Sequence, residues 1–297
     1  MKNLQNQGVK MFDKKKVKEL VLISLVADAY SLGSHWVYDE KELENLDIDW
    51  NELNDAKAIW HKGKKAGDFT HYGDQTLWLY EFLKDKDKFN ADAYVEFWAD
   101  KMKNYDGYVD AATRDSLENI KNNISPSGSF STDLSIVGRI APLLLVSKSK
   151  EEFLQNVENF VKCTHNSDEA IKTAKFFASL LLEILDGKMV KDAILVFKGK
   201  YGIEKELYFD TIIASKYNDS FKTIREFGPS CDIDGGFEGV IHLLCKYDNL
   251  KEMLIANAKA GGDSSARAMI ASIVFMAQKG QSIEQLPASW LKLNSFV

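Results

Sequence analysis

The chain has 297 residues, of which 45% are hydrophobic and 28% charged, proportions typical of a globular protein long enough to bury a large core. Its net charge of −6 argues against nucleic acid as a partner, and its longest apolar runs are far too short to span a bilayer. Three cysteines without CxxC spacing, and a polar start without an apolar secretory segment, predict a cytoplasmic protein with no zinc site and no membrane partner.

Apolar residues recur at three- and four-residue steps along most of the chain, whereas the alternating pattern of strands is hard to find. Helices are predicted, in chain order, at 15–32, 75–87, 91–105, 112–123, 134–148, 151–163, 167–186, 189–200, 236–246, 249–259 and 264–278. The fold class is therefore all-α, a single compact multi-helix orthogonal bundle. No linker rich in proline, glycine or serine divides the chain, so we expect a disordered extension over 1–13 and one domain over 14–297.

Three of these segments are apolar on almost every face, and a helix of that kind is buried. They are Val17–Ser31, Ile136–Val146 and Ala266–Ala277. We expect them to form the centre, with the amphipathic helices around them.

The first of these segments carries a carboxylate, Asp28, on an apolar surface. Such a group must be paired, hydrogen-bonded or at the edge of a cavity. Just beyond the helix, His35, Trp36 and Tyr38 bring an imidazole, an indole and a phenol together, which suits stacking on a base or ribose. A structural hydrogen-bond hub and a satisfied core histidine are the alternatives.

The segment 67–76 places two aspartates, a histidine and Tyr72 before or at the start of a predicted helix. Carboxylate, amide and hydroxyl oxygens are hard ligands suited to Mg²⁺ or Ca²⁺, although no complete spacing motif is present. Asp74 and Gln75 are the candidate ligands here. A plain N-cap at Asp74 is the alternative.

A Gly-Gly turn, Gly261-Gly262, delivers Asp263 to the start of a helix rich in small residues. Helix N-termini present unpaired N–H groups and a positive dipole end, which suits a cation, a phosphate or a ribose. Capping of the amides of Ser265 and Ala266 is the alternative role for Asp263.

Three further residues are candidates for ligand contact. Arg267 stands one turn into the same apolar helix, where it would pair with a carboxylate or a phosphate. Thr164 and His165 precede an amphipathic helix, and a capping loop explains them equally well.

The order of these features resembles the ADP-ribosylglycohydrolase superfamily over most of residues 15–295. The resemblance is carried by Ala27–His35, Gly73–Thr76, Gly138–Pro142, Thr164–His165, Gly261–Ala266 and Leu286–Leu291. The spellings of these motifs look closer to the branch that contains the jellyfish J1 crystallins and selenoprotein J.

The resemblance implies hydrolysis of an N- or O-glycosidic bond of an ADP-ribose-like nucleotide, with two magnesium ions in family members of known activity. Of the carboxylates in the family's motifs, Asp74 and Asp263 remain here, whereas His35, Gln75 and Ser265 replace the others. Two dications would therefore lack charge compensation. We expect at most one Mg²⁺, held by Asp74, Gln75, Asp263 and Ser265.

On this resemblance the catalytic candidates are Asp74, Asp263 and His35, the last as a general acid or base. The candidates for ligand binding are Asp28, Trp36, Tyr72, Thr164, His165, Gly261, Gly262 and Arg267. The expected partner is a small-molecule nucleotide or an ADP-ribosylated substrate. The alternative is a non-catalytic relative that binds a nucleotide or serves a structural, crystallin-like role, since a fold does not guarantee its chemistry.

Overall fold

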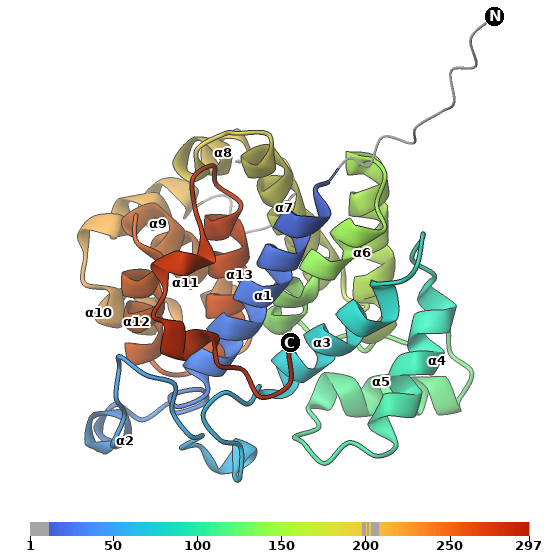
Figure 1. The fold of residues 1–297 in the computed structure, drawn as a ribbon, viewed down its shortest axis with the longest axis horizontal. Helices are drawn as coiled ribbons and strands as arrows, with labels where there is room; N and C mark the ends of the chain where they lie inside the picture. Colours follow the sequence, from blue (N-terminus) through green and yellow to red (C-terminus); the bar gives the residue numbers. More distant parts are fainter. Residues whose placement is uncertain (1–11, 198–199, 201, 203–207, 297) are drawn as a thin grey trace, which may run out of the picture.

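The computed structural model describes residues 12–296 except 198–199, 201 and 203–207. Within these residues every named element is an α-helix or a 3-10 helix, and the only β pairing consists of two isolated bridges. The predicted all-α, orthogonal multi-helix bundle is confirmed (Figure 1). Residues 1–11 of the predicted extension lie outside the described residues, and the single domain over 14–297 stays a prediction.

The centre of the bundle is formed by α1 (Lys14–Ser31) and α13 (Ser264–Met276), which pack against each other (Figure 1). Every residue of α13 is buried, and α1 is buried almost throughout from Leu20 to its end. Small and apolar residues on all faces leave no side of these helices that favours water. Two of the three segments expected at the centre are therefore confirmed as central helices.

The third central segment is buried, but the helix predicted over 134–148 is wrong. The chain forms two 3-10 helices there, η2 (Leu134–Arg139) and η3 (Ala141–Leu145). Pro142 has no N–H to donate to an α-helical hydrogen bond, which separates the two segments. Gly138 lets η2 approach α13 closely, because a Cβ at this position would lie 2.8 Å from the Cβ of Met269.

The remaining elements surround this centre, and Figure 1 places α4 and α5 at one edge and α9, α10 and α12 at another. They are α2 (Glu40–Asn45), η1 (Ile59–His61), α3 (His71–Leu83), α4 (Ala91–Met102), α5 (Ala111–Lys121), α6 (Lys150–Thr164), α7 (Asp168–Leu185), α8 (Val190–Val196), α9 (Phe209–Ala214), η5 (Ser215–Tyr217), α10 (Ser220–Phe227), α11 (Ile233–Lys246), α12 (Leu250–Lys259), η6 (Ile283–Gln285) and η7 (Ala288–Leu291). The helix predicted at 75–87 begins earlier, at His71, because the Thr70 hydroxyl caps it by accepting from the Tyr72 amide at 3.1 Å.

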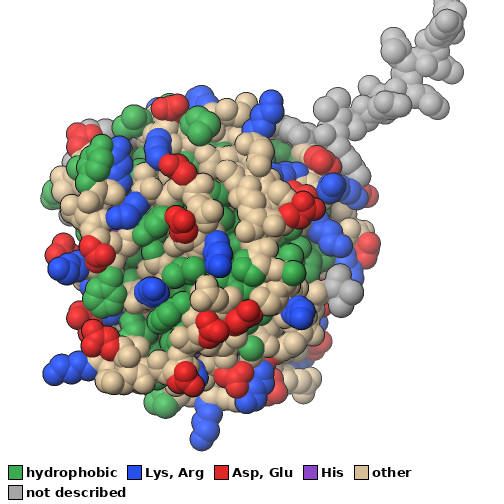
Figure 2. Space-filling view, turned by 60° about the vertical axis from the view of Figure 1, so that its left-hand side comes forward, with side chains coloured by type: hydrophobic (Ala, Val, Ile, Leu, Met, Phe, Trp, Pro, Cys, Tyr) green, Lys and Arg blue, Asp and Glu red, His purple; other side chains and the backbone are tan. Residues whose placement is uncertain are grey.

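Basic and acidic side chains alternate over the face shown in Figure 2, with apolar side chains between them. This face carries no field of a single sign of the kind that a phosphate backbone needs. Among the helices that the structure describes, none combines the length and the apolar character needed to cross a bilayer.

Substitution of Gly138 by alanine tests the close packing of η2 on α13. The added methyl group would press on Met269, so we expect the free energy of unfolding to fall by about 1–3 kcal/mol in urea titrations. The same substitution should cost less in a Met269→Gly background, where the Cβ that the added methyl group would meet is gone. Equal costs in both backgrounds would show that the contact does not limit the packing.

Candidate functional site

The Gly261-Gly262 turn fixes the start of α13 by backbone hydrogen bonds to two other segments. Trp36 N donates to Gly262 O at 2.7 Å, Gly262 N donates to Val37 O at 2.8 Å, and Asp263 N donates to the carbonyl of residue 229 at 2.8 Å. Both glycines have positive φ, +65° and +59°, and a Cβ at Gly261 would lie 2.5 Å from the Val37 oxygen. The turn therefore holds Trp36 and Asp263 next to each other.

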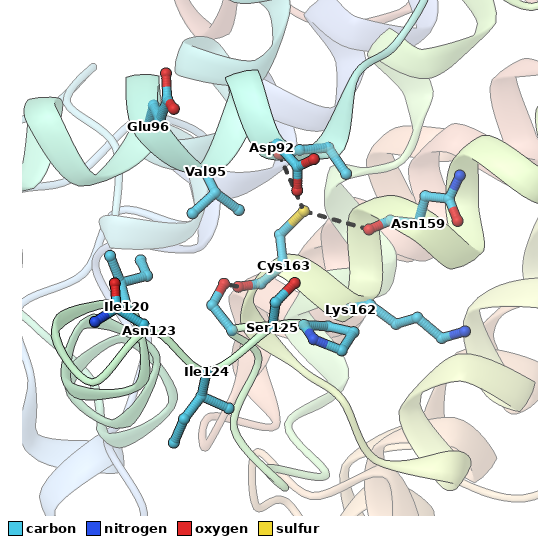
Figure 3. Close-up of a pocket in the computed structure, with 13 residues that line it drawn as sticks. Asp92, Val95, Glu96, Ile120, Asn123, Ile124, Ser125, Asn159, Lys162 and Cys163 are labelled. Carbon is cyan, nitrogen blue, oxygen red and sulfur yellow. Dashed lines mark hydrogen bonds between the residues drawn. The ribbon is translucent and has the colours of Figure 1, made fainter.

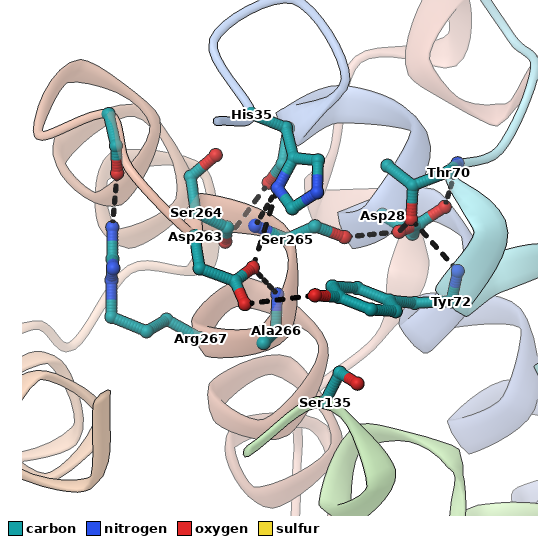
Figure 4. Close-up of polar contacts among 12 residues, drawn as sticks. Asp28, His35, Thr70, Tyr72, Ser135, Asp263, Ser264, Ser265, Ala266 and Arg267 are labelled. Carbon is teal, nitrogen blue, oxygen red and sulfur yellow. Dashed lines mark hydrogen bonds and ion pairs between the residues drawn. The ribbon is translucent and has the colours of Figure 1, made fainter. Parts of the chain in front are cut away.

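The carboxyl group of Asp263 is buried and contacts three side- or main-chain groups (Figure 4). Oδ1 accepts from Ala266 N at 3.2 Å, which caps α13, and Oδ2 accepts from the Tyr72 hydroxyl at 3.1 Å. His35 Nδ1 lies 3.4 Å from Oδ1. Burial raises the pKa of Asp263 to about 8, and the charge of nearby Asp133 adds to this shift. A large share of Asp263 is thus protonated at neutral pH.

His35 is placed to accept a hydrogen bond from the protonated carboxyl group of Asp263. Its Nδ1 accepts from Ser265 N at 3.4 Å, so the lone pair is on the nitrogen that faces Asp263. Burial lowers the pKa of His35 well below its usual value, and the neighbouring His61 and His71 lower it further. A neutral His35 therefore carries its proton on Nε2, which is buried and has no partner among the described residues.

A second carboxyl group, Asp133, faces Asp263 across the Tyr72 hydroxyl. The Tyr72 oxygen lies 3.5 Å from Asp133 Oδ2, and Asp133 caps η2 by accepting from Ser135 N at 2.8 Å. Burial raises the pKa of Asp133, as does Asp110. One atom each from Asp133, Asp263 and Cys231 lies within 4.8 Å of the others. Sequence reasoning did not place Asp133 or Cys231 in the site; the signals for them are the position of Asp133 before an apolar run and that of Cys231 in the turn-rich segment 227–236.

Asp28 is a closed hydrogen-bond hub between α1, α3 and α13 (Figure 4). It accepts from Thr70 N at 2.7 Å, from Thr70 Oγ1 at 2.6 Å and from the Ser265 hydroxyl. Burial raises its pKa, against the lowering effect of these donors. A side chain at Gly73 would collide with this carboxyl group. Asp28 and Ser265 therefore serve as each other's hydrogen-bond partners.

Asp74 and Gln75 bond to groups other than Asp263 and Ser265. Lys64 Nζ lies 2.8 Å from Asp74 Oδ2, and the Tyr105 hydroxyl donates to the same oxygen at 2.7 Å. Gln75 Oε1 accepts from the Arg139 guanidinium at 2.8 Å and from Trp98 Nε1 at 3.0 Å. The four residues predicted to hold Mg²⁺ are thus engaged in separate hydrogen-bond groups.

Trp36 lies at the centre of an aromatic group next to Asp263. Its ring stacks on His35 with centroids 4.9 Å apart, and meets Tyr108, His61 and His71 at 5.0 to 5.2 Å. The group borders a hollow of about 640 Å³ that is lined by Trp60, His61, Lys62, Gly63, Lys64, Asp68, Asp106, Gly107, Tyr108 and Val109. A hollow of this size accommodates a nucleotide-sized ligand.

Several buried polar atoms around Trp36 and Tyr72 have no hydrogen-bond partner among the described residues. They are His35 Nε2, Trp36 Nε1, His61 Nδ1, His71 Nε2, Gln75 Nε2, Arg139 Nε and His165 Nε2. Buried polar atoms are nearly always paired, so such a concentration is typical of a binding site for a polar ligand.

The remaining predicted ligand contacts have structural partners. Arg267 donates from Nε to Asn257 Oδ1 at 2.9 Å and from its NH2 group to Gly261 O at 2.6 Å, which holds the glycine turn. The Thr164 hydroxyl lies 2.9 Å from His165 Nδ1. His165 and Arg267 are buried and each keeps one unpartnered nitrogen, His165 Nε2 and the NH1 group of Arg267, so both have an atom left for a ligand.

A second hollow, of about 360 Å³, lies between α4, α5 and α6 (Figure 3). Cys163 is at its base, where the thiol faces the carbonyls of Asn159 and Ala91. None of the residues predicted to form the site lines this hollow.

Comparisons with known proteins identify the family of the chain and a solved structure of similar fold. A family model described as ADP-ribosylglycohydrolase matches residues 11–294. The chain belongs to the ADP-ribosylglycohydrolase family. Crystallins J1A and J1B of Tripedalia cystophora are 25% and 23% identical to it, over 95% and 94% of this chain and 92% and 91% of their own lengths. A solved structure titled ADP-ribosylglycohydrolase-related protein complex is similar in fold, with a TM-score of 0.71 at 18% identity, over 93% of this chain and 92% of that chain.

ADP-ribosylglycohydrolases typically bind Mg²⁺, but the residues here do not fit a pair of these ions. The guanidinium of Arg139 occupies the Gln75 oxygen, Lys64 neutralises Asp74, and Ser265 offers a hydroxyl already donated to Asp28. The Asp133, Cys231 and Asp263 group offers two carboxylates and a thiolate, a donor set that suits one Zn²⁺ better than Mg²⁺.

Thermal-shift measurements test this assignment of the donor sets. Millimolar Mg²⁺ should move the melting temperature by less than about 1 °C, because Asp74, Gln75 and Ser265 are already bonded to other side chains. Zn²⁺ should raise the melting temperature of the wild type and leave Cys231→Ser unchanged. A rise with Mg²⁺ that disappears in Asp74→Asn would instead favour the metal set expected from the sequence.

The pKa of Asp263 also predicts how stability depends on pH. A native pKa of about 8, against about 3.9 for an unfolded aspartate, means that the folded state holds this proton more tightly. The resulting stabilisation is complete below pH 4 and is lost as the pH rises toward 8, at up to about 1.4 kcal/mol per pH unit. Asp263→Asn should therefore gain stability relative to the wild type between pH 6 and 8.

Urea titrations across this range provide the measurement, and Asp100→Asn on the exposed face of α4 is the matched control. The control should follow the wild type. Parallel curves for Asp263→Asn and the wild type would contradict a protonated Asp263.

Proposed function

We propose that the protein hydrolyses an N- or O-glycosidic bond of an ADP-ribose-like nucleotide, with Asp263 as the general acid. The observation that carries this proposal is the pair of carboxyl groups, half-buried Asp133 and buried Asp263, that share the Tyr72 hydroxyl. Two carboxyl groups at such short range do not both ionise readily, so one of them keeps its proton near neutral pH.

The reaction requires one proton for the leaving group. Protonated Asp263 gives this proton to the leaving nitrogen or oxygen, which takes the electron pair of the broken glycosidic bond, while a water oxygen bonds to the ribose carbon. The Tyr72 hydroxyl and His35 hold the carboxyl group in place. The indole of Trp36 offers a stacking surface for the nucleotide.

The charges of the site are consistent with glycosidic hydrolysis that does not depend on Mg²⁺. Arg139 and Lys64 supply positive charge beside Gln75 and Asp74, where bound cations would otherwise compensate the phosphates of the substrate. We therefore assign Asp74 the role of orienting Lys64 at the edge of the hollow. The reaction as proposed needs no Mg²⁺.

A second candidate function is nucleotide binding without catalysis. The closed hydrogen-bond hub of Asp28, Thr70 and Ser265 favours it, because it stabilises the pocket with residues that would otherwise serve a ligand. Two similar proteins are named crystallins. The two functions differ in turnover and not in affinity.

Hydrolysis assays with ADP-ribosyl-arginine and ADP-ribosyl-serine peptides in the presence of EDTA separate the two functions. We expect turnover by the wild type and a decrease in kcat of about 10²–10⁴-fold in Asp263→Asn, since the amide cannot give up a proton as an acid. Asp92→Asn, in the second hollow, is the matched control and should retain full activity.

The proposal is wrong if ADP-ribose raises the melting temperature but neither peptide is cleaved, an outcome that would establish the binding function. Turnover that requires Mg²⁺ and is lost in Asp74→Asn would restore the metal-dependent reaction.

A further inference from the structure

Three residues outside the predicted site form a chain of hydrogen-bonding groups that ends at the large hollow. His61 Nε2 lies 3.1 Å from His71 Nδ1, and His71 Nε2 lies 3.2 Å from Asp110 Oδ2. The three residues come from η1, the first turn of α3 and the N-cap of α5. All three are buried, so their mutual contacts are protected from solvent.

The ionised state of Asp110 determines which ring nitrogen carries the proton in His71 and in His61. Burial alone would raise the pKa of Asp110, but the contact with His71 and the charge of Arg139 hold it well below its usual value. Its other oxygen accepts from Thr113 N at 2.6 Å. Asp110 is therefore an ionised carboxylate, which accepts hydrogen bonds and donates none.

The tautomers of the two histidines follow from this. A carboxylate oxygen 3.2 Å from Nε2 favours the tautomer of His71 that carries its proton on Nε2, although this contact lacks the geometry of a hydrogen bond, and His71 Nδ1 is then an acceptor. His61 then donates from Nε2, and its Nδ1 carries a lone pair. That nitrogen is buried and has no partner among the described residues.

His61 also lines the 640 Å³ hollow, together with Trp60, Lys64 and Tyr108. The ring of His61 lies 5.0 Å from that of His35, and His35 in turn contacts Asp263. His61 and Asp263 are therefore both neighbours of His35. Of the three residues of the chain, His61 is the one that lines the hollow and that a polar ligand there would meet.

We propose that Asp110, His71 and His61 form a proton relay, and that His61 Nδ1 is the general base for a hydroxyl group, water or a ribose hydroxyl, bound in the Trp60–Tyr108 hollow. His61 would contact the ligand, whereas His71 and Asp110 are positioning residues. As the partner base of Asp263, the relay rests on the proposed hydrolase function.

The step balances without any other reactant. The O–H bond of the ligand breaks, its electron pair stays on oxygen, and its proton binds His61 Nδ1. The Nε2 proton of His61 passes to His71 Nδ1, and the imidazolium formed there lies beside the Asp110 carboxylate, which stabilises it.

The electrostatic surroundings explain why the relay is needed. Burial is the main cause that lowers the pKa of His61 to about 3. His35, Trp36 and Tyr108 are its other ring neighbours, and none of them is an acid. His61 is thus neutral at pH 7, but it accepts a proton readily only if the charge moves on toward Asp110.

The relay can be tested without any enzymatic assay by ¹⁵N NMR of histidine-labelled protein. We expect His61 and His71 both as Nε2–H tautomers at pH 7, with a through-hydrogen-bond ¹⁵N–¹⁵N coupling between them. His165 faces a hydroxyl instead of an imidazole and should show no such coupling. An Nδ1–H tautomer for His61, or no coupling, overturns the relay whatever the activity of the protein.

Two isosteric variants then test the catalytic role. His61→Gln keeps a donor for His71 but loses the acceptor at Nδ1, and should lower kcat by about 10²–10⁴-fold with little change in KM. His61→Asn keeps an acceptor near the Nδ1 position without the link to His71, and should recover only part of this loss. His242→Gln is the control, since both ring nitrogens of His242 contact serines away from the site.

Each failure has its own signature. Full activity in His61→Gln contradicts the base assignment while the Asp263 proposal stands. If the wild type cleaves neither peptide, the hydrolase proposal fails, and the base assignment fails with it even where NMR shows the intact hydrogen-bonded chain.

Discussion

A single buried carboxyl group, Asp28, holds together the three helices that build the site. It emerges from α1 and accepts hydrogen bonds from Thr70 at the start of α3 and from Ser265 in the first turn of α13. The desolvation of an aspartate in this position is offset only if all of its donors are present, so the helix starts are fixed relative to each other. Tyr72 and Asp263 each lie two residues from one of these donors, and their contact is a consequence of that constraint.

Protons and fixed side-chain cations take the place in this pocket that divalent ions take in a metal-dependent relative. Asp133 and Asp263 relieve their mutual repulsion by raised pKa values, and Gln75 and Asp74 are bonded to Arg139 and Lys64. Positive charge supplied by an arginine cannot move or exchange, unlike a bound ion. The positive charges beside Gln75 and Asp74 are therefore fixed, while the protonation of Asp263 depends on pH.

The sequence predicted the helical class, most helix positions and the burial of the central segments, because apolar periodicity depends only on neighbours along the chain. It missed the break between η2 and η3, although Pro142 was visible, since an apolar run reads the same in an α-helix and in a 3-10 helix. It also placed the start of α3 too late. The Thr70 cap was overlooked there because His71 and Tyr72 carry no strong helical preference.

The sequence alone determined which residues stand at helix starts, and thereby the glycine turn, Asp263 and the family. Only the tertiary structure decided which of these residues meet. Asp74 and Asp263 were equivalent as sequence motifs, yet a helix turns by about 100° per residue, so Tyr72 faces Asp263 while Asp74 faces Lys64. Asp133, Cys231 and the chain from Asp110 to His61 join segments far apart in the sequence, and no local pattern encodes such contacts.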